Sequence, residues 1–168
     1  PSPTRRRAHA CPGSSAAAAL PVSSEAGRPT RCPNADGSAS EAFFHFIGGM
    51  QTNKVRQLAG KVDVFESVDR EHVVRELARR AAGARVLVQV QATADAADKA
   101  GCPVEQVGDL VALAADLGLR VEGFMCVGPT AGGPEAARLP FRRTRALVDA
   151  LGLAVCSMGM TGDLEVAV

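Results

Sequence analysis

The sequence has little net charge, no closely spaced pair of cysteines and no long apolar run. Its 168 residues carry 19 basic and 18 acidic side chains, so no general electrostatic field would recruit nucleic acid or an anionic membrane. The five cysteines include no CxxC pair and leave one over in any disulfide scheme, which indicates a reduced, cytoplasmic compartment. No apolar run approaches the ~20 residues needed to cross a bilayer, and we expect no export signal. A small molecule is therefore the expected partner.

Residues 1–42 form a tract of Ala, Ser, Pro, Gly and Arg without a periodic apolar face. Such a composition cannot bury enough apolar surface to offset the loss of conformational entropy, so we predict that the tract is disordered. Two other interpretations stay open. The tract is rich in Arg and Ser like a transit peptide, although it lacks the amphipathic stripe of such peptides. Its bias is also that of GC-rich DNA read out of frame, which would make it a non-native tract.

From residue 43 onward short apolar runs alternate with helical periodicity, which is the pattern of repeated β/α units. We therefore predict that residues 43–168 form one α/β domain, and the 46% hydrophobic content of the chain is sufficient for a substantial core. The run at 85–91 is almost continuously apolar, as expected of a parallel strand covered on both faces. Strands are predicted at 43–47, 63–67, 85–91, 120–127 and 153–157.

Parallel strands joined by single helices imply either an open doubly wound sheet or a closed barrel, and the chain has no GxGxxG turn to favour the dinucleotide-binding open sheet. Four strings bear on the choice: HFIGGMQTNKVRQL at 45–58, ESVD at 66–69, GFMCVGP at 123–129 and CSMGMTGDLEVAV at 156–168. In this order they resemble motifs of the YggS-type pyridoxal-phosphate homeostasis proteins, which are similar to the N-terminal barrel of alanine racemases. The resemblance implies a partial (β/α)8 TIM-type barrel of about five β/α units. It also implies pyridoxal 5′-phosphate as cofactor and a role in vitamin B6 and amino-acid homeostasis, without established turnover.

The resemblance further implies a site for the cofactor phosphate at the turn that follows the last predicted strand. Active sites of such barrels lie at the C-terminal ends of strands, and hydroxyl and free backbone N–H groups ahead of a helix can hold a phosphate dianion. The alternative is an ordinary capped turn with two core methionines. The residues of this predicted cofactor-binding turn are Ser157, Met158, Gly159 and Thr161.

Two residues near the first predicted strand complete the set of cofactor-binding candidates, His45 and Asn53. His45 lies inside an apolar strand, where a histidine is more often a satisfied core residue than a ligand. Asn53 belongs to the helix-opening motif and suits either capping or bracing the barrel mouth. Lys54 lies in a helix rather than at a strand end, so we expect it to be solvated.

We predict neither a metal site nor a catalytic residue. No pair of histidines has the spacing of metal ligands. Cys102, Cys126 and Cys156 are expected to be small buried hydrophobes, since no feature near them would lower a thiol pKa.

In the family, the cofactor lysine belongs to an AVSK-like strand that precedes an FGEN-like turn, and neither string occurs here. The only lysines are Lys54, Lys61 and Lys99, and Lys99 matches a mobile loop of the family. We therefore predict a truncated barrel that lacks the Schiff-base lysine, a non-functional fragment whose open sheet edges allow self-association. The alternatives are a pyridoxal-phosphate-dependent enzyme similar to amino-acid racemases, and a remnant or interaction protein without cofactor.

Overall fold

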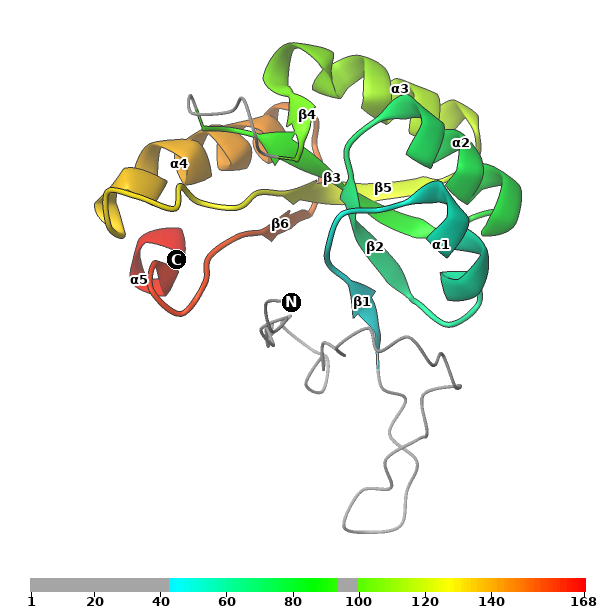
Figure 1. The fold of residues 1–168 in the computed structure, drawn as a ribbon. Coiled ribbons are helices and arrows are strands. Elements are labelled where there is room, and N and C mark those ends of the chain that lie inside the picture. Colours follow the sequence, from blue (N-terminus) through cyan, green and yellow to red (C-terminus); the bar gives the residue numbers. More distant parts are fainter. Residues whose placement is uncertain (1–42, 94–99) are drawn as a thin grey trace, which may run out of the picture.

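The computed structural model describes residues 43–93 and 100–168, and the tract 1–42, for which we predicted disorder, lies outside them. Strands and helices alternate along the described chain (Figure 1). The elements are β1 (His45–Phe46), α1 (Thr52–Leu58), β2 (Val64–Val68), α2 (Glu71–Arg80), β3 (Arg85–Gln91), β4 (Cys102–Pro103), η2 (Val104–Gln106), α3 (Val107–Asp116), β5 (Arg120–Met125), α4 (Glu135–Ala150), β6 (Val155–Ser157) and α5 (Leu164–Ala167).

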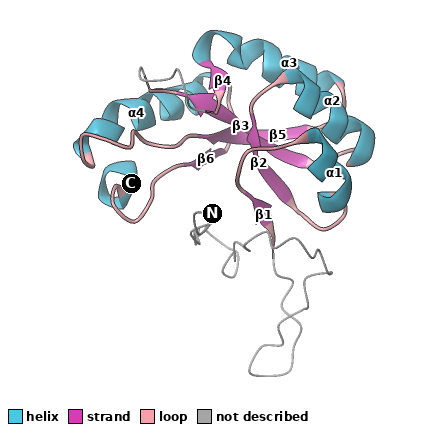
Figure 2. Cartoon of the chain, viewed as in Figure 1, coloured by secondary structure: helices cyan, strands magenta, loops and turns pink. Residues whose placement is uncertain are grey.

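Neighbouring strands of the sheet are parallel, and their order is β1-β2-β3-β5-β6, with the short β4 paired to β3 outside this order. Helices α1 to α4 pack against one face of the sheet (Figure 2). A doubly wound sheet would reverse its strand order and place helices on both faces, whereas strands laid down in sequence order are those of a barrel. The prediction of a partial barrel with about five β/α units is therefore confirmed.

The lengths of the strands differ from the sequence-based expectation mainly at the two edges. β3 spans the predicted residues, while β1 is two residues and β6 three residues long. Each of these outer strands pairs with a single neighbour within the described residues, so fewer ladder hydrogen bonds define its ends. β4 was not predicted because its two residues, Cys102 and Pro103, carry no strand pattern.

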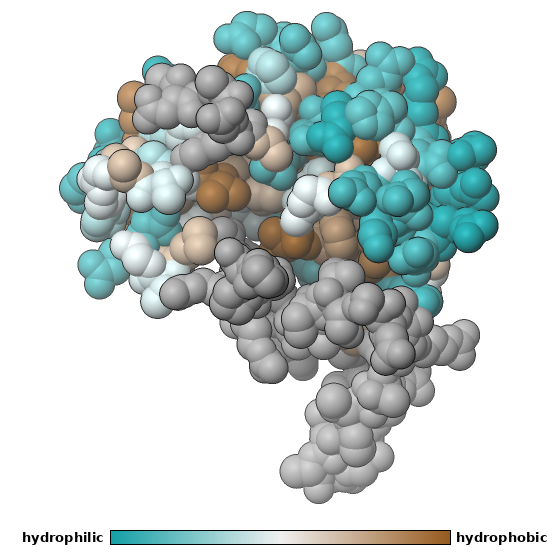
Figure 3. All heavy atoms as spheres, viewed as in Figure 1, coloured by the Kyte–Doolittle hydropathy of each residue, from teal (hydrophilic) through white to brown (hydrophobic). Residues whose placement is uncertain are grey.

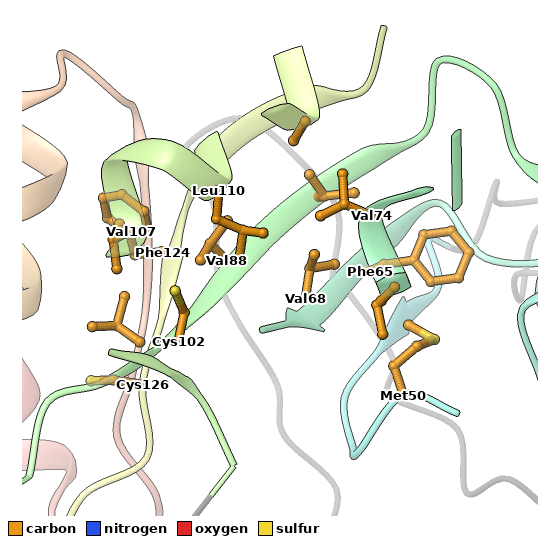
Figure 4. Packing of buried hydrophobic residues seen from close by; sticks show 14 of the residues in the cluster. Met50, Phe65, Val68, Val74, Val88, Cys102, Val107, Leu110, Phe124 and Cys126 are labelled. Atoms are coloured by element: carbon orange, nitrogen blue, oxygen red, sulfur yellow. The ribbon is translucent and has the colours of Figure 1, made fainter. Parts of the chain in front are cut away.

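The main hydrophobic core lies between the sheet and its helices. Val86, Val88 and Val90 of β3 alternate toward this side, as the two-residue period of a strand requires. Figure 4 shows Val88 close to Leu110 of α3 and to Phe124 of β5. Complete burial of side chains of this size stabilises a fold by about 1.5–3 kcal/mol each. This layer therefore stabilises the strands that also form the other face of the sheet.

The outer surface of the helices is polar. Figure 3 shows hydrophilic residues covering α1 and α2. In the described ranges no helix has both the length and the apolar character that crossing a membrane would require.

Candidate functional site

The face of the sheet turned away from α1 to α4, which we call the concave face, carries a smaller set of apolar side chains. Val64, Leu87 and Met125 come from β2, β3 and β5 and form a buried cluster. Ile47 and Val155 pack against this cluster from the two ends of the sheet. The concave face therefore has an apolar floor. Strands β2, β3, β5 and β6 each supply one of its residues, and the remaining residue, Ile47, directly follows β1.

A buried carboxylate links three strands across this face. Glu66 of β2 is 1% exposed, and its Oε2 accepts a hydrogen bond of 2.6 Å from the Ser157 hydroxyl of β6. Its Oε1 lies 2.5 Å from Nδ1 of His45 on β1. Because β3 and β5 separate β2 from β6 in the sheet, the bond between Glu66 and Ser157 requires the sheet to curl. This side-chain contact is therefore evidence that the sheet curls into a half-barrel.

Two of the predicted site residues, His45 and Ser157, therefore lie together on one carboxylate. The role of Glu66 was missed by sequence reasoning, although a charged residue inside the apolar run of β2 was visible in the ESVD motif. His45 is a satisfied residue with 22% of its side chain exposed. Both oxygens of the buried carboxylate have donors, as a buried charge requires.

The turn after β6 is built around Gly159. Gly159 is buried and has a φ of +89°, and a Cβ at this position would lie 2.8 Å from the Cβ of Ala167. The backbone N–H of Met160 donates to the carboxylate of Asp163. By contrast, the N–H groups of Thr161 and Gly162 and the Thr161 hydroxyl have no hydrogen-bond partner among the described residues. The turn therefore presents three free donors to solvent beyond the end of β6.

The remaining predicted residues do not converge on these donors. Met158 packs against the helix-side core and Asn53 is exposed on α1. Lys54 is exposed on α1, in agreement with its expected solvation, and Lys61 lies in the turn after that helix. Neither of these two lysines is on a strand, and Lys99 lies outside the described residues.

A hollow of about 300 Å³ opens at the C-terminal ends of β3 and β5. Polar groups line part of it, and the amide of Gln89 donates a hydrogen bond of 2.8 Å to the carbonyl of Ala100 at its rim. This volume is at the lower end of the range for small-molecule sites. The lining residues are Gln89, Val90, Gln91, Ala92, Thr93, Ala100, Val127 and Thr130.

The three cysteines in the described part of the chain behave as small apolar side chains. Cys102 and Cys126 are buried, as predicted, whereas Cys156 is only half-buried, and all three are free thiols. Burial raises the pKa of Cys102 to about 11, with further contributions from the negative charges of Asp69 and Glu105. Burial likewise raises the pKa of Cys156. Within residues 43–93 and 100–168 no group of three or more His, Cys, Asp or Glu side chains could hold a metal ion.

Comparison with known proteins connects this architecture to a family. No family model matches the chain. The pyridoxal phosphate homeostasis protein of Aquifex aeolicus is 36% identical over 136 residues, which cover 74% of this chain and 59% of that protein. The protein of the same name from Pseudomonas aeruginosa is 36% identical over 132 residues, which cover 74% of this chain and 57% of that protein. Over about three quarters of its length the chain is therefore similar to pyridoxal phosphate homeostasis proteins.

Solved structures share the fold of this chain, which spans less than two thirds of the length of the curated relatives it matches. A protein of unknown function from Bifidobacterium adolescentis has a TM-score of 0.66 at 30% identity, over 76% of this chain and 57% of that one. PipY of Synechococcus elongatus, determined with pyridoxal phosphate bound, has a TM-score of 0.67 at 22% identity, over 76% of this chain and 64% of its own. The latter likeness shows the shared fold.

The residues present fit one part of the family's cofactor better than the other. A phosphate dianion needs several donors, and the turn offers the N–H groups of Thr161 and Gly162 and the Thr161 hydroxyl. The hydroxyl of Ser157 is turned instead toward Glu66. An aldehyde needs a neighbouring amine, and neither Lys54 nor Lys61 lies on a strand of the concave face. The turn supplies donors of the kind that a phosphate group needs, and an attachment point for the aldehyde is not found in the described ranges.

Proposed function

We propose that this chain is a pyridoxal 5′-phosphate-binding protein of vitamin B6 and amino-acid homeostasis that recognises the cofactor through its phosphate and does not hold it covalently. The observation that carries the proposal is the turn after β6, where three donors at Thr161 and Gly162 have no acceptor among the described residues. The names of the relatives support the choice of cofactor. Bound pyridoxal phosphate supplies an aldehyde that condenses with amines.

The absence of covalent attachment rests on the lysines. The sequence contains Lys54, Lys61 and Lys99 alone, and Lys54, on the outer helix α1, is exposed to solvent. A stable linkage needs the amine, the ring contacts and the phosphate cradle to be held together. We therefore place the chain among non-catalytic binding proteins, and its free thiols favour the cytoplasm.

Phosphate recognition is tested with compounds that carry no aldehyde. Titration calorimetry of the 168-residue chain with pyridoxine 5′-phosphate and with pyridoxine measures the preference for the phosphate without lysine adducts. Thr161→Val should weaken binding of the phosphorylated compound about tenfold, because one charge-assisted hydrogen bond is lost. Thr161→Ser keeps the hydroxyl and should retain the affinity. Equal binding of the two compounds by the unmodified chain would refute the proposed function.

Covalent attachment is tested separately. The chain is incubated with pyridoxal 5′-phosphate, desalted and reduced with borohydride, and modified peptides are mapped by mass spectrometry. We expect low, heterogeneous modification of Lys54, Lys61 and Lys99. Near-complete modification of one lysine that survives desalting would show that the chain builds a covalent site of its own.

We also propose that the chain associates with itself and has no nucleic-acid partner. The outer strands β1 and β6 each pair with one strand in the described part of the chain, and unpaired strand edges favour pairing with another chain. The near balance of 19 basic and 18 acidic residues offers nucleic acid no extended field. Size-exclusion chromatography over a range of protein concentrations should show a shift from monomer to larger species.

A further inference from the structure

The carboxylate of Glu66 takes no part in the phosphate recognition proposed above, yet it is one of the most deeply buried polar groups of the described residues. It is 1% exposed and accepts hydrogen bonds from two other strands. Burial of a carboxylate is costly unless its oxygens are paired. Its place on the concave face, where it joins β2 to β1 and β6, therefore calls for a role that an apolar residue could not fill.

We infer that Glu66 is a positioning residue for the phosphate-binding turn, which it holds in place through Ser157. The inference rests on the proposed function, and it assigns Ser157 the role of an anchor in place of the direct phosphate contact predicted from the motif. The bond between the Ser157 hydroxyl and Glu66 Oε2 is 2.6 Å long and buried, so this hydroxyl is committed to the interior of the half-barrel.

The place of Ser157 in the chain explains how the contact reaches the turn. Ser157 is the last residue of β6, and the turn with the free donors begins directly after it. On one side β6 is held by β5, where Ser157 pairs with Met125 and its carbonyl accepts from the N–H of Cys126. The side chain of Glu66 restrains the same residue from across the concave face. The first residue of the turn is thereby fixed from two directions.

The far end of the turn has its own restraints. The carboxylate of Asp163 accepts from the N–H of Met160, and Gly159 lies against Ala167 of α5. Between these restraints and Ser157, the donors of Thr161 and Gly162 are held at a fixed place relative to β6. A shift of a few tenths of an ångström in such a cradle lowers affinity, because its hydrogen bonds depend on distance and angle.

His45 completes the arrangement. Its Nδ1 lies 2.5 Å from Glu66 Oε1, so the second oxygen of the carboxylate also has a partner. With this pairing Glu66 stays an acceptor for Ser157. Hydrogen bonds thus link Ser157 on β6 to Glu66 on β2, and Glu66 to His45 on β1. The first pair is separated by 91 positions in the sequence and the second by 21.

A double-mutant cycle in the full 168-residue chain tests the inference. The variants are Glu66→Met, which keeps the side-chain length and removes the acceptor, Ser157→Ala, and the two combined. The readout is the ratio of affinities for pyridoxine 5′-phosphate and pyridoxine, measured by calorimetry. Each single variant should lower the ratio about fivefold, and the combination should lower it no further, because both substitutions remove the same hydrogen bond.

The outcomes separate the possible roles. A ratio lowered by Ser157→Ala but unchanged by Glu66→Met would overturn the inference, because Ser157 would then contact the phosphate directly. Cooperative unfolding in urea checks that each variant folds. If Glu66→Met does not fold, Glu66→Gln replaces it, and this variant keeps one oxygen acceptor and should lower the ratio by a smaller factor. If every variant keeps the preference for the phosphorylated compound, the proposed function stands and the positioning role of Glu66 is refuted. If the unmodified chain shows no such preference, both the proposed function and the role of Glu66 are refuted.

Discussion

The two faces of the sheet differ in how they are built. On the helix side, twenty-one buried apolar residues of the described chain form one continuous cluster. On the concave side, three buried apolar residues form the floor, and Glu66, Gln89 and Ser157 add buried polar groups above it. The same strands supply both faces, because successive side chains of a strand point in opposite directions.

The helix side of the sheet therefore contributes mainly to the stability of the fold, and the concave side contributes the polar groups of the candidate site. The helix-side core is almost entirely apolar, and its buried Thr144 hydroxyl is satisfied within α4 by the carbonyl of Pro140, so its main contribution is burial of apolar area. The concave side keeps polar groups whose hydrogen bonds must all be made, which fixes their geometry. We therefore expect substitutions on the two faces to have different costs and different functional consequences.

A matched pair of substitutions gives the largest expected effect. Leu77→Ala removes a fully buried side chain of α2 on the helix side and should lower the free energy of unfolding by about 3–5 kcal/mol. Leu87→Ala on the concave face should cost about 2 kcal/mol, because Leu87 belongs to a cluster of only three buried apolar residues and not to the main core. Urea unfolding followed by circular dichroism measures both. Equal losses, or a larger loss for Leu87→Ala, would contradict the proposed division between the faces.

The two faces also differ in how far the sequence predicts them. The apolar run of β3 and the helical spacing around it are local patterns, so the strand spans its predicted residues. The turn at Gly159 was visible as a motif for the same reason. The contact between Glu66 and Ser157 joins residues 91 positions apart, and it exists only because the sheet curls. No local period encodes that curl, which is why the acceptor of Ser157 was missed and why β4, two residues paired to the end of β3, was not foreseen.

The helix-side core should lose stability in alkaline solution through Cys102. Its pKa is raised to about 11 from a usual value of 9.0, chiefly by burial. The folded state therefore holds this proton more tightly than the unfolded state, so the contribution to stability is complete below pH 9 and is lost as the pH rises from about 9 to about 11. The full loss is about 3 kcal/mol. Urea unfolding at pH 8 and pH 10.5 should record about two thirds of this loss, roughly 2 kcal/mol, because pH 10.5 lies below the raised pKa.

Cys102→Ala provides the control for this measurement, because it removes the thiol and leaves every other group that titrates in this range. The difference in stability between pH 8 and pH 10.5 should be smaller in this variant than in the unmodified chain. The same pH dependence in both proteins would mean that Cys102 is not the group responsible, and that its surroundings are less dry than the helix-side core requires.

The smallest expected effect on stability tests how the concave face is closed. Gly123 of β5 pairs with Val155 of β6, and a Cβ there would lie 1.8 Å from the carbonyl oxygen of Val155. Gly123→Ala should therefore push β6 outward at a cost of about 1–3 kcal/mol, since a short edge strand can move. Because β6 carries Ser157, the Gly123→Ala variant should also lose preference for pyridoxine 5′-phosphate over pyridoxine.

The control is Gly108→Ala in α3, where a Cβ meets nothing within 4 Å. This variant should instead gain about 0.5–1 kcal/mol in the free energy of unfolding. If both alanines proved equally harmless to stability and to phosphate preference, the position of β6 would not control the turn, and the link from the concave face to the phosphate site would be broken.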